Sequence, residues 1–131
     1  MPRLVKGGKW VYGWSIVGRA SRVCIPPDAY REYWFQAGDR VVFLRGSRTS
    51  GGCSVARSEA VMVSPVPLVR RSLGTGIMQA GGRVALPRSL DIRPGERLLV
   101  VRGSGIALGL IQRGPIFEEA MAHADLVTYP A

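Results

Sequence analysis

The sequence contains no asparagine, a single histidine and two cysteines, and the scarcity of cysteine and histidine argues against two classes of site. Cys24 and Cys53 are too few for a disulfide framework, and in a reducing compartment we expect both to be buried thiols. The single histidine, His123, and the absence of CxxC or HxxxH spacing argue against a metal site. No motif for a bound cofactor is present, so none is expected.

Long hydrophobic runs and groups of catalytic residues are also missing. No apolar stretch approaches the roughly 20 residues that span a bilayer, so no membrane association is expected. The segment from Met1 to Gly13 lacks the apolar region of a secretory signal, which predicts a cytoplasmic protein. His123 has no identifiable nucleophile or carboxylate partner, and the adjacent Glu118 and Glu119 would point in different directions on a helix. We therefore do not expect an enzyme.

Arginine, glycine and proline are abundant. The chain has 131 residues, 47% hydrophobic and 21% charged, which is typical of a single globular domain. The net charge is +9, and only Lys6 and Lys9 among the 18 basic residues are lysines. This excess favours an anionic partner, although genome base composition or thermal adaptation would produce the same bias. The 17 glycines and 9 prolines favour short strands joined by turns over a helix bundle.

The sequence repeats itself. With a shift of 61 positions Tyr12–Pro26 aligns with Leu73–Pro87, and with a shift of 57 Gly38–Ser47 aligns with Gly95–Ser104. Each alignment contains five identical pairs, against about two in total expected by chance from the composition. The identical pairs are Gly13/Gly74, Ile16/Ile77, Arg22/Arg83, Val23/Val84, Pro26/Pro87, Gly38/Gly95, Arg40/Arg97, Arg45/Arg102, Gly46/Gly103 and Ser47/Ser104.

Both repeats predict the same order of elements. The third strand of each is an apolar run, which is typical of a strand buried on both faces. Trp10, Tyr12 and Trp14 alternate in the first strand, which predicts three aromatic side chains on one face, packed in the core or forming a stacking platform or oligomer interface. The predicted strands are 10–17, 22–25, 41–44 and 53–57 in the first repeat and 72–78, 83–86, 98–101 and 106–113 in the second. Helices are predicted at 27–34 and 114–122, with a single turn at 88–91.

Four short segments carry a resemblance to a known family: Ser21–Pro26, Gly38–Phe43, Gly82–Pro87 and Gly95–Val100. Their order, with a hairpin, a short helix, a Gly-acid turn and a second hairpin, resembles the AbrB-like family, which includes AbrB and SpoVT regulators and MazE-type antitoxins. The resemblance implies a mainly β fold: a pseudo-twofold AbrB-like swapped-hairpin β-barrel made from two tandem β-hairpin/short-helix repeats, with a short C-terminal helix. One chain could close this barrel, which would cover its apolar faces and sheet edges; a dimer of such units is the alternative.

This fold divides the chain into four segments that form one compact domain. Residues 1–57 are the first half-barrel repeat, 58–69 a linker that we expect to pack, and 70–113 the second half-barrel repeat. Residues 114–131 are the C-terminal helix and tail.

The resemblance also implies DNA contacts by arginines on one barrel face. It places the motif arginine at Arg22 and Arg83 and the helix arginine at Arg31, with Arg88 near the corresponding position of the second repeat. The family's upstream arginine is missing in both repeats, and Arg19 is the candidate to replace it. Solvated or structural roles for these arginines are the alternative. We expect four others to be structural, pairing with Asp39, Glu96 or carbonyl groups: Arg40, Arg45, Arg97 and Arg102.

The leading hypothesis is therefore a double-stranded-DNA-binding transcriptional regulator of the AbrB-like type, with an antitoxin-like repressor as one form. The alternative is a non-catalytic protein-interaction or assembly module that kept the barrel and lost the DNA contacts, with a protein partner or a homodimer. Residues 1–65 carry a net charge of +6 and residues 66–131 carry +3, so the first repeat is expected to dominate any DNA contact.

Overall fold

The computed structural model describes residues 3–4, 9–65, 67–103 and 105–131. Strands dominate it and a few short helices connect or cover them, which confirms the predicted mainly β class. None of the described helices is both long enough and apolar enough to cross a bilayer. The strands are β1 (Arg3–Leu4), β2 (Lys9–Ile16), β3 (Arg22–Cys24), β4 (Arg40–Arg45), β5 (Cys53–Arg57), β6 (Ser72–Ile77), β7 (Arg83–Ala85), β8 (Arg97–Arg102), β9 (Leu108–Ile111) and β10 (Thr128–Pro130). The helices are α1 (Pro27–Glu32), α2 (Ser58–Met62) and α3 (Pro115–Met121), and the 3₁₀ turns are η1 (Arg19–Ser21), η2 (Leu68–Arg71) and η3 (Ala80–Gly82).

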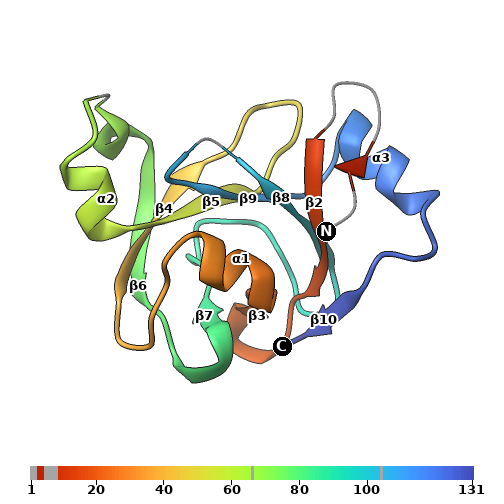
Figure 1. The fold of residues 1–131 in the computed structure, drawn as a ribbon, viewed down its shortest axis with the longest axis horizontal. Coiled ribbons are helices and arrows are strands. Elements are labelled where there is room, and N and C mark those ends of the chain that lie inside the picture. The colour runs from red at the N-terminus through yellow and green to blue at the C-terminus, as the bar shows by residue number, and fades with distance from the viewer. Residues whose placement is uncertain (1–2, 5–8, 66, 104) are drawn as a thin grey trace.

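The two repeats exchange strands within one sheet (Figure 1). Among the described residues the sheet runs in the order β1-β2-β8-β9-β5-β4-β6, and β10 pairs with β2 in parallel. First-repeat strand β2 pairs with second-repeat strand β8, and β6 of the second repeat pairs with β4 of the first. Strands β3 and β7 form a separate two-stranded ribbon. Each repeat thus completes the sheet of the other.

The repeat in the sequence is also a repeat in the backbone. The amide of Val17 donates to the carbonyl of Glu96 at 2.8 Å, and the amide of Met78 donates to the carbonyl of Asp39 at the same distance. The sequence alignment makes these two bonds equivalent. Ser104, the last residue of the aligned segments, lies outside the described residues.

The closed barrel that the resemblance implied does not form in the described part of the chain. Strands β1 and β6 stand at the two ends of the sheet, and no strand pairing joins them. The β3–β7 ribbon instead packs on the inner side of the sheet, where Val23 and Val84 share a cluster with Phe43 and Leu98. The ribbon thus helps to cover the inner cluster, and it does not join the outer edges of β1 and β6.

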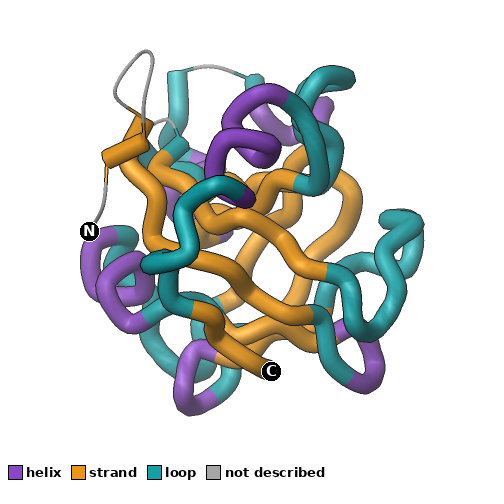
Figure 2. The backbone as a smooth tube through the Cα atoms, turned by 90° about the vertical axis from the view of Figure 1, so that its right-hand side faces the viewer, coloured by secondary structure: helices purple, strands orange, loops and turns teal. Residues whose placement is uncertain are grey.

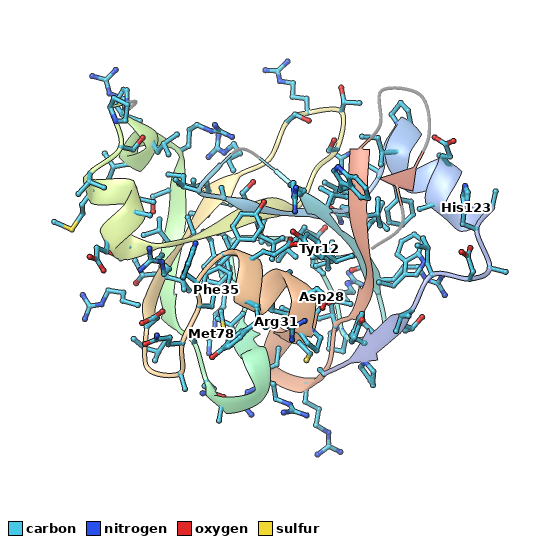
Figure 3. The ribbon with its side chains drawn as sticks, in the orientation of Figure 1. Tyr12, Asp28, Arg31, Phe35, Met78 and His123 are labelled. Atoms are coloured by element: carbon cyan, nitrogen blue, oxygen red, sulfur yellow. The ribbon has the colours of Figure 1, made fainter. Side chains whose placement is uncertain are left out.

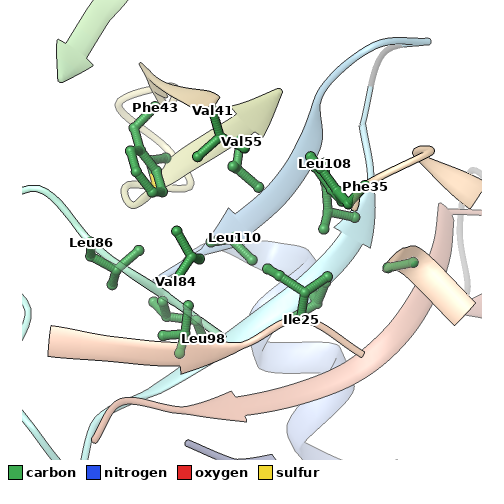
Figure 4. Close-up of a cluster of buried hydrophobic side chains, with 14 of the residues drawn as sticks. Ile25, Phe35, Val41, Phe43, Val55, Val84, Leu86, Leu98, Leu108 and Leu110 are labelled. Atoms are coloured by element: carbon green, nitrogen blue, oxygen red, sulfur yellow. The ribbon is translucent and has the colours of Figure 1, made fainter. Parts of the chain in front are cut away.

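One apolar cluster, drawn from both repeats, fills the inside of the sheet (Figure 4). The four central residues of β4 and of β8 are all buried, which confirms that these strands are covered on both faces. Val41, Phe43, Leu98 and Val100 are fully buried and belong to the inner cluster, while the residues between them belong to clusters on the outer face. Both repeats supply this core, so neither can form it alone.

Two smaller clusters cover the outer face of the sheet. Helices α2 and α3 lie on opposite sides of the molecule in Figure 1, and Figure 2 shows the strands crossing between the peripheral helices and loops. At one end Ile116 and Phe117 of α3 pack on β2 and β8. At the other end, Val61 of α2 and Leu68 of η2 pack on β4.

The aromatic residues of β2 do not share a face. Tyr12 belongs to the inner cluster, whereas Trp14 belongs to the outer cluster beneath α3. The pairing of β2 with β8 shifts register between Val11 and Gly13. After this bulge, the side chains that alternation would place inward point outward. The prediction from simple alternation was therefore wrong, because an extra residue inverts the pattern.

Gly13 also holds the C-terminal strand against β2. Its φ is +138°, and a Cβ at this position would lie 2.5 Å from the carbonyl oxygen of Val127, which accepts a hydrogen bond from the Trp14 amide at 2.8 Å. We expect Gly13→Ala to detach β10 and to speed hydrogen exchange at the Trp14 amide roughly 10- to 100-fold, since such strain costs about 1–3 kcal/mol.

Gly74 offers a matched control for that change. It has nearly the same φ, +143°, but a Cβ there would meet only Pro87 at 3.7 Å. Gly74→Ala should therefore leave the Trp14 amide protected. Unchanged protection in Gly13→Ala would show that the contact with Val127 does not hold β10.

Several elements differ from the prediction. The linker 58–69 does pack, but it contains α2 and the first residues of η2. A turn forms at 88–91 as predicted, where the amide of Leu90 donates to the carbonyl of Pro87 at 3.2 Å, but β10 was not predicted. Helix α1 ends at Glu32 because Trp34 adopts a left-handed φ of +62°, and the amide of Phe35 bonds back to the carbonyl of Tyr30. The division into four segments stays a prediction.

Candidate nucleic-acid interface

The β3–β7 ribbon has one face in the core and one in solvent. Val23 pairs with Val84 across the ribbon, and both side chains are fully buried. Because successive side chains of a strand point to opposite faces, Arg22 and Arg83 project from the solvent face, and both are exposed. The structure thus brings the two motif arginines, 61 positions apart in the sequence, onto one surface.

The register makes these two arginines diagonal neighbours. Arg22 lies opposite Ala85, and Arg83 lies opposite Cys24, so the Cβ atoms of the two arginines are somewhat less than roughly 7–8 Å apart. Neither arginine makes an ion pair with any of the residues that the structure describes. The two charges are therefore uncompensated and stand beside small side chains that leave them accessible.

Two left-handed turns set the start of the ribbon. Ser21 has φ +57° and its counterpart Gly82 has φ +78°. The carbonyl of Gly82 accepts from the amide of Ile25, and that of Ser21 accepts from the amide of Leu86, so each turn extends the pairing of the other repeat. Glycine adopts this conformation freely, whereas serine costs about 1 kcal/mol. The glycine of the Gly-Arg-Val motif is the sequence signal for this turn.

Two of the other three predicted DNA-contacting arginines flank the ribbon in the sequence, and the third lies on α1. Arg19 begins η1, three residues before Arg22, and is exposed. Arg88 is exposed just after the ribbon ends, and neither it nor Arg19 makes an ion pair among the described residues. Arg31 lies on α1 and pairs with Asp28 on the preceding turn (Figure 3). The charge of Arg31 is thus partly neutralised, unlike the charges at the ribbon.

The arginines that flank the third strands do not pair as predicted. The carboxylates of Asp39 and Glu96 accept hydrogen bonds from backbone amides of their own turns, at Gln36 and Arg93. These acids stabilise the turns and leave the flanking arginines to other partners. Arg97 lies over the ring of Trp14 at 5.0 Å from its centre, and Arg102 bonds to Glu32 at 2.9 Å.

A polar network that the sequence did not predict fixes α1 to the sheet. The hydroxyl of Tyr12 on β2 donates a short hydrogen bond to the carboxylate of Glu32 at the end of α1, and Arg102 on β8 donates to the same oxygen. The amide of Gly103 donates to the hydroxyl of Tyr33 at 3.1 Å. These residues are far apart in the sequence, so no local pattern reveals them.

The network shifts the pKa values of its members. The hydrogen bond from Tyr12, supported by Arg102, lowers the pKa of Glu32, while burial and the bond to Glu32 raise the pKa of Tyr12 to about 12. Tyr12 therefore stays protonated as the donor and Glu32 stays ionised as the acceptor at neutral pH. This arrangement holds α1, and hence Arg31, in place.

Because the folded-state pKa of Glu32 lies below its usual value of 4.5, the network stabilises the protein above that pH and loses its contribution as the pH falls further. We expect Glu32→Gln to lower the free energy of unfolding at pH 7 by about 1 kcal/mol, since the carboxylate is partly exposed. The difference from the unsubstituted protein should shrink in denaturant titrations at decreasing pH below 4.5. A difference that stays constant across this range would contradict the role of the ionised carboxylate.

Among the other reactive groups of the described chain, Cys53 and His123 lie apart from the ribbon, whereas Cys24 lies in it opposite Arg83 and is not fully buried as predicted. Burial raises the pKa of the Cys53 thiol to about 12, which keeps it protonated, and Cys24 is half-buried. His123 lies 3.9 Å from Asp125, and both side chains are exposed to solvent near the end of α3 (Figure 3). The described residues contain no group of three or more His, Cys, Asp or Glu placed to bind one metal ion.

The ribbon can therefore present two forked cations on a narrow, accessible surface, with further arginines at its ends. Comparison of the chain with protein-family models, with curated proteins and with solved structures finds no match.

Proposed function

We propose that this protein is a double-stranded-DNA-binding regulator of the AbrB-like type and that the β3–β7 ribbon is its DNA-contacting element. The observation that carries the proposal is the shared outward face of Arg22 and Arg83, which are exposed and make no ion pair among the described residues. The net charge of +9 supports an anionic partner.

A two-stranded ribbon has the dimensions to enter the major groove of B-DNA. The planar fork of an arginine side chain can bond to a phosphate or to the paired acceptors of a guanine. Arg22 and Arg83 would each bond to a phosphate at the edge of the groove, and Arg19 and Arg88 at the ends of the ribbon would neutralise further phosphates on either side. Arg31 would join them only if the DNA displaces Asp28.

The proposed relation to AbrB-like proteins concerns the architecture as well. The exchange of strands, with β2 on β8 and β6 on β4, supports a swapped-hairpin arrangement of two half-units in one chain. In this proposal the ribbon takes the place of full closure and carries the DNA contacts at the junction of the two repeats. A single chain would then present both motif arginines without forming a dimer.

Binding of short random-sequence and genomic duplexes tests the proposal, with fluorescence anisotropy as the readout. If Arg19, Arg22, Arg83 and Arg88 each neutralise a phosphate, the affinity should fall about 100-fold or more between about 50 and 200 mM salt. Absence of duplex binding at the lowest salt would overturn the proposal.

A further inference from the structure

The two edge regions of the sheet differ in whether a further strand covers them. On β2, the C-terminal strand β10 pairs with Trp14, Ser15 and Ile16. The corresponding residues of β6 are 75–77, and in the described part of the chain β6 pairs only with β4. The hydroxyl of Ser89 reaches the carbonyl of Leu73 at 3.5 Å, so the open part of this edge begins beyond that contact.

The open edge presents hydrogen-bonding groups. Trp14 pairs with Leu99 across β2 and β8, and its amide points away from β8 to donate to Val127 on the other side. Thr75 pairs with Val42 at the corresponding position, so its amide points away from β4. An exposed strand edge of this kind is a template for another strand.

A groove adjoins this edge because the second repeat lacks a counterpart of Trp14. On the β2 side, the Trp14 side chain is 3% exposed and packs edge-on against Phe117, with ring centres 5.0 Å apart. On the β6 side the corresponding residue is Thr75, and a groove of about 500 Å³ lies beside it. Its apolar lining includes Val42, Val61, Met62, Leu68 and Val69.

The rim of the groove is apolar and basic. Met62 and Val69 are 82% and 68% exposed, which is unusual for large apolar side chains in a monomeric surface. An adjoining depression shares Leu68 with the groove and is lined by Arg57 and Arg71; Arg57 pairs with Glu59 at 3.6 Å, so Arg71 supplies the net positive charge there. Arg45 and Arg70 stand near the Ser72 end of β6, and Glu59 is the acid that faces this depression.

This charge distribution decides between occupants. A second copy of the chain carries the same +9 charge and would bring the same arginines together. An acidic segment would instead meet them with complementary charge. A large apolar residue in that segment would fill the space that Trp14 fills on the opposite side.

We propose that the edge of β6 and its groove bind an extended acidic segment of a partner protein, which adds to the sheet parallel to β6 and inserts one large apolar side chain beside Thr75. Strand addition obtains affinity from backbone hydrogen bonds and specificity from side-chain pockets. The chain's own β10 on β2 shows the orientation, with Leu126 buried in the outer cluster just before its strand begins. This interaction is independent of the DNA-binding ribbon.

The test uses a labelled peptide, Glu-Asp-Leu-Val-Thr-Tyr-Glu-Glu, which extends the sequence found at 125–129 with acidic residues. Its basic counterpart replaces the first two and the last two residues with lysine. We expect the acidic peptide to bind the full chain and to protect the amides of Thr75 and Ile77 from hydrogen exchange. The basic counterpart should bind at least tenfold more weakly.

Thr75→Trp supplies the decisive variant, because tryptophan would fill the groove as Trp14 fills the opposite side. Thr75→Trp should weaken binding of the acidic peptide at least tenfold. The control Thr49→Trp, at an exposed turn position, should leave this binding unchanged. Equal binding to Thr75→Trp would mean that the peptide displaces β10 or binds elsewhere, and it would overturn the proposal. No peptide binding, equal binding of the basic peptide, or dimerisation of the chain that Thr75→Trp abolishes would also overturn it.

Discussion

Replacement of Phe43 by alanine is expected to lower the free energy of unfolding by about 3–5 kcal/mol. The ring is fully buried at the centre of the inner cluster, where a Cβ on Gly76 of the paired strand would lie 3.2 Å from its edge. Strand β4, which carries Phe43, is tied by hydrogen bonds to β5 on one side and to β6 on the other, so it resists collapse into the cavity. Denaturant titration monitored by circular dichroism measures the change.

The same experiment tests whether the repeats fold together. Because Phe43 of the first repeat packs among residues of the second, we expect one cooperative transition that moves as a whole. Trp34→Ala is the matched control, since that ring is 75% exposed and its removal should change the free energy by at most about 0.5 kcal/mol. Two separate transitions, with only one of them shifted by Phe43→Ala, would show that the repeats are independent.

Replacement of both ribbon arginines is expected to have the largest effect on the proposed DNA binding. Each arginine contact to DNA contributes about 1–3 kcal/mol, so the Arg22→Ala, Arg83→Ala double variant should bind duplex roughly 30-fold more weakly or worse. Both side chains are exposed and make no ion pair within the part of the chain that the structure describes, so the fold should tolerate the change. Anisotropy with the same duplexes measures the affinity, and circular dichroism confirms the fold.

The control for this variant removes the same charge elsewhere. Arg45 and Arg48 are exposed at the end of β4 that leads to β5. The ribbon lies near the other end of β4, where Asp39 bonds to Met78. Arg45→Ala, Arg48→Ala should therefore weaken binding much less than the ribbon variant. Equal losses in the two double variants would indicate a general effect of net charge.

The strands could be predicted because their signals are local. Apolar runs between arginines at 41–44 and 98–101 are long enough to mark buried strands, and prolines after 25 and 86 end the ribbon strands. Because the sequence repeats, the same order of strands is predicted independently in each half. The bulge at Gly13 escaped prediction because one extra residue reverses which side chains point inward, and no residue type marks it uniquely.

The candidate site was predictable in part for the same reason. The motif placed Arg22 and Arg83 at equivalent positions, but only the register of β3 with β7 shows that they share a face. The bond network of Tyr12, Glu32 and Arg102 depends on contacts between residues distant in sequence, which sequence patterns do not encode. The groove beside Thr75 is visible only by comparison with Trp14 across the fold.

The salt dependence of duplex binding tests the central claim most directly. Each phosphate that an arginine neutralises contributes about 0.9 to the slope of the logarithm of affinity against the logarithm of salt concentration. If Arg22 and Arg83 each contact a phosphate, the slope for Arg22→Ala, Arg83→Ala should be less steep than that of the unsubstituted protein by about 1.8. The slope for Arg45→Ala, Arg48→Ala should not change. An unchanged slope in the ribbon variant would contradict the assignment of the β3–β7 ribbon as the DNA-contacting element.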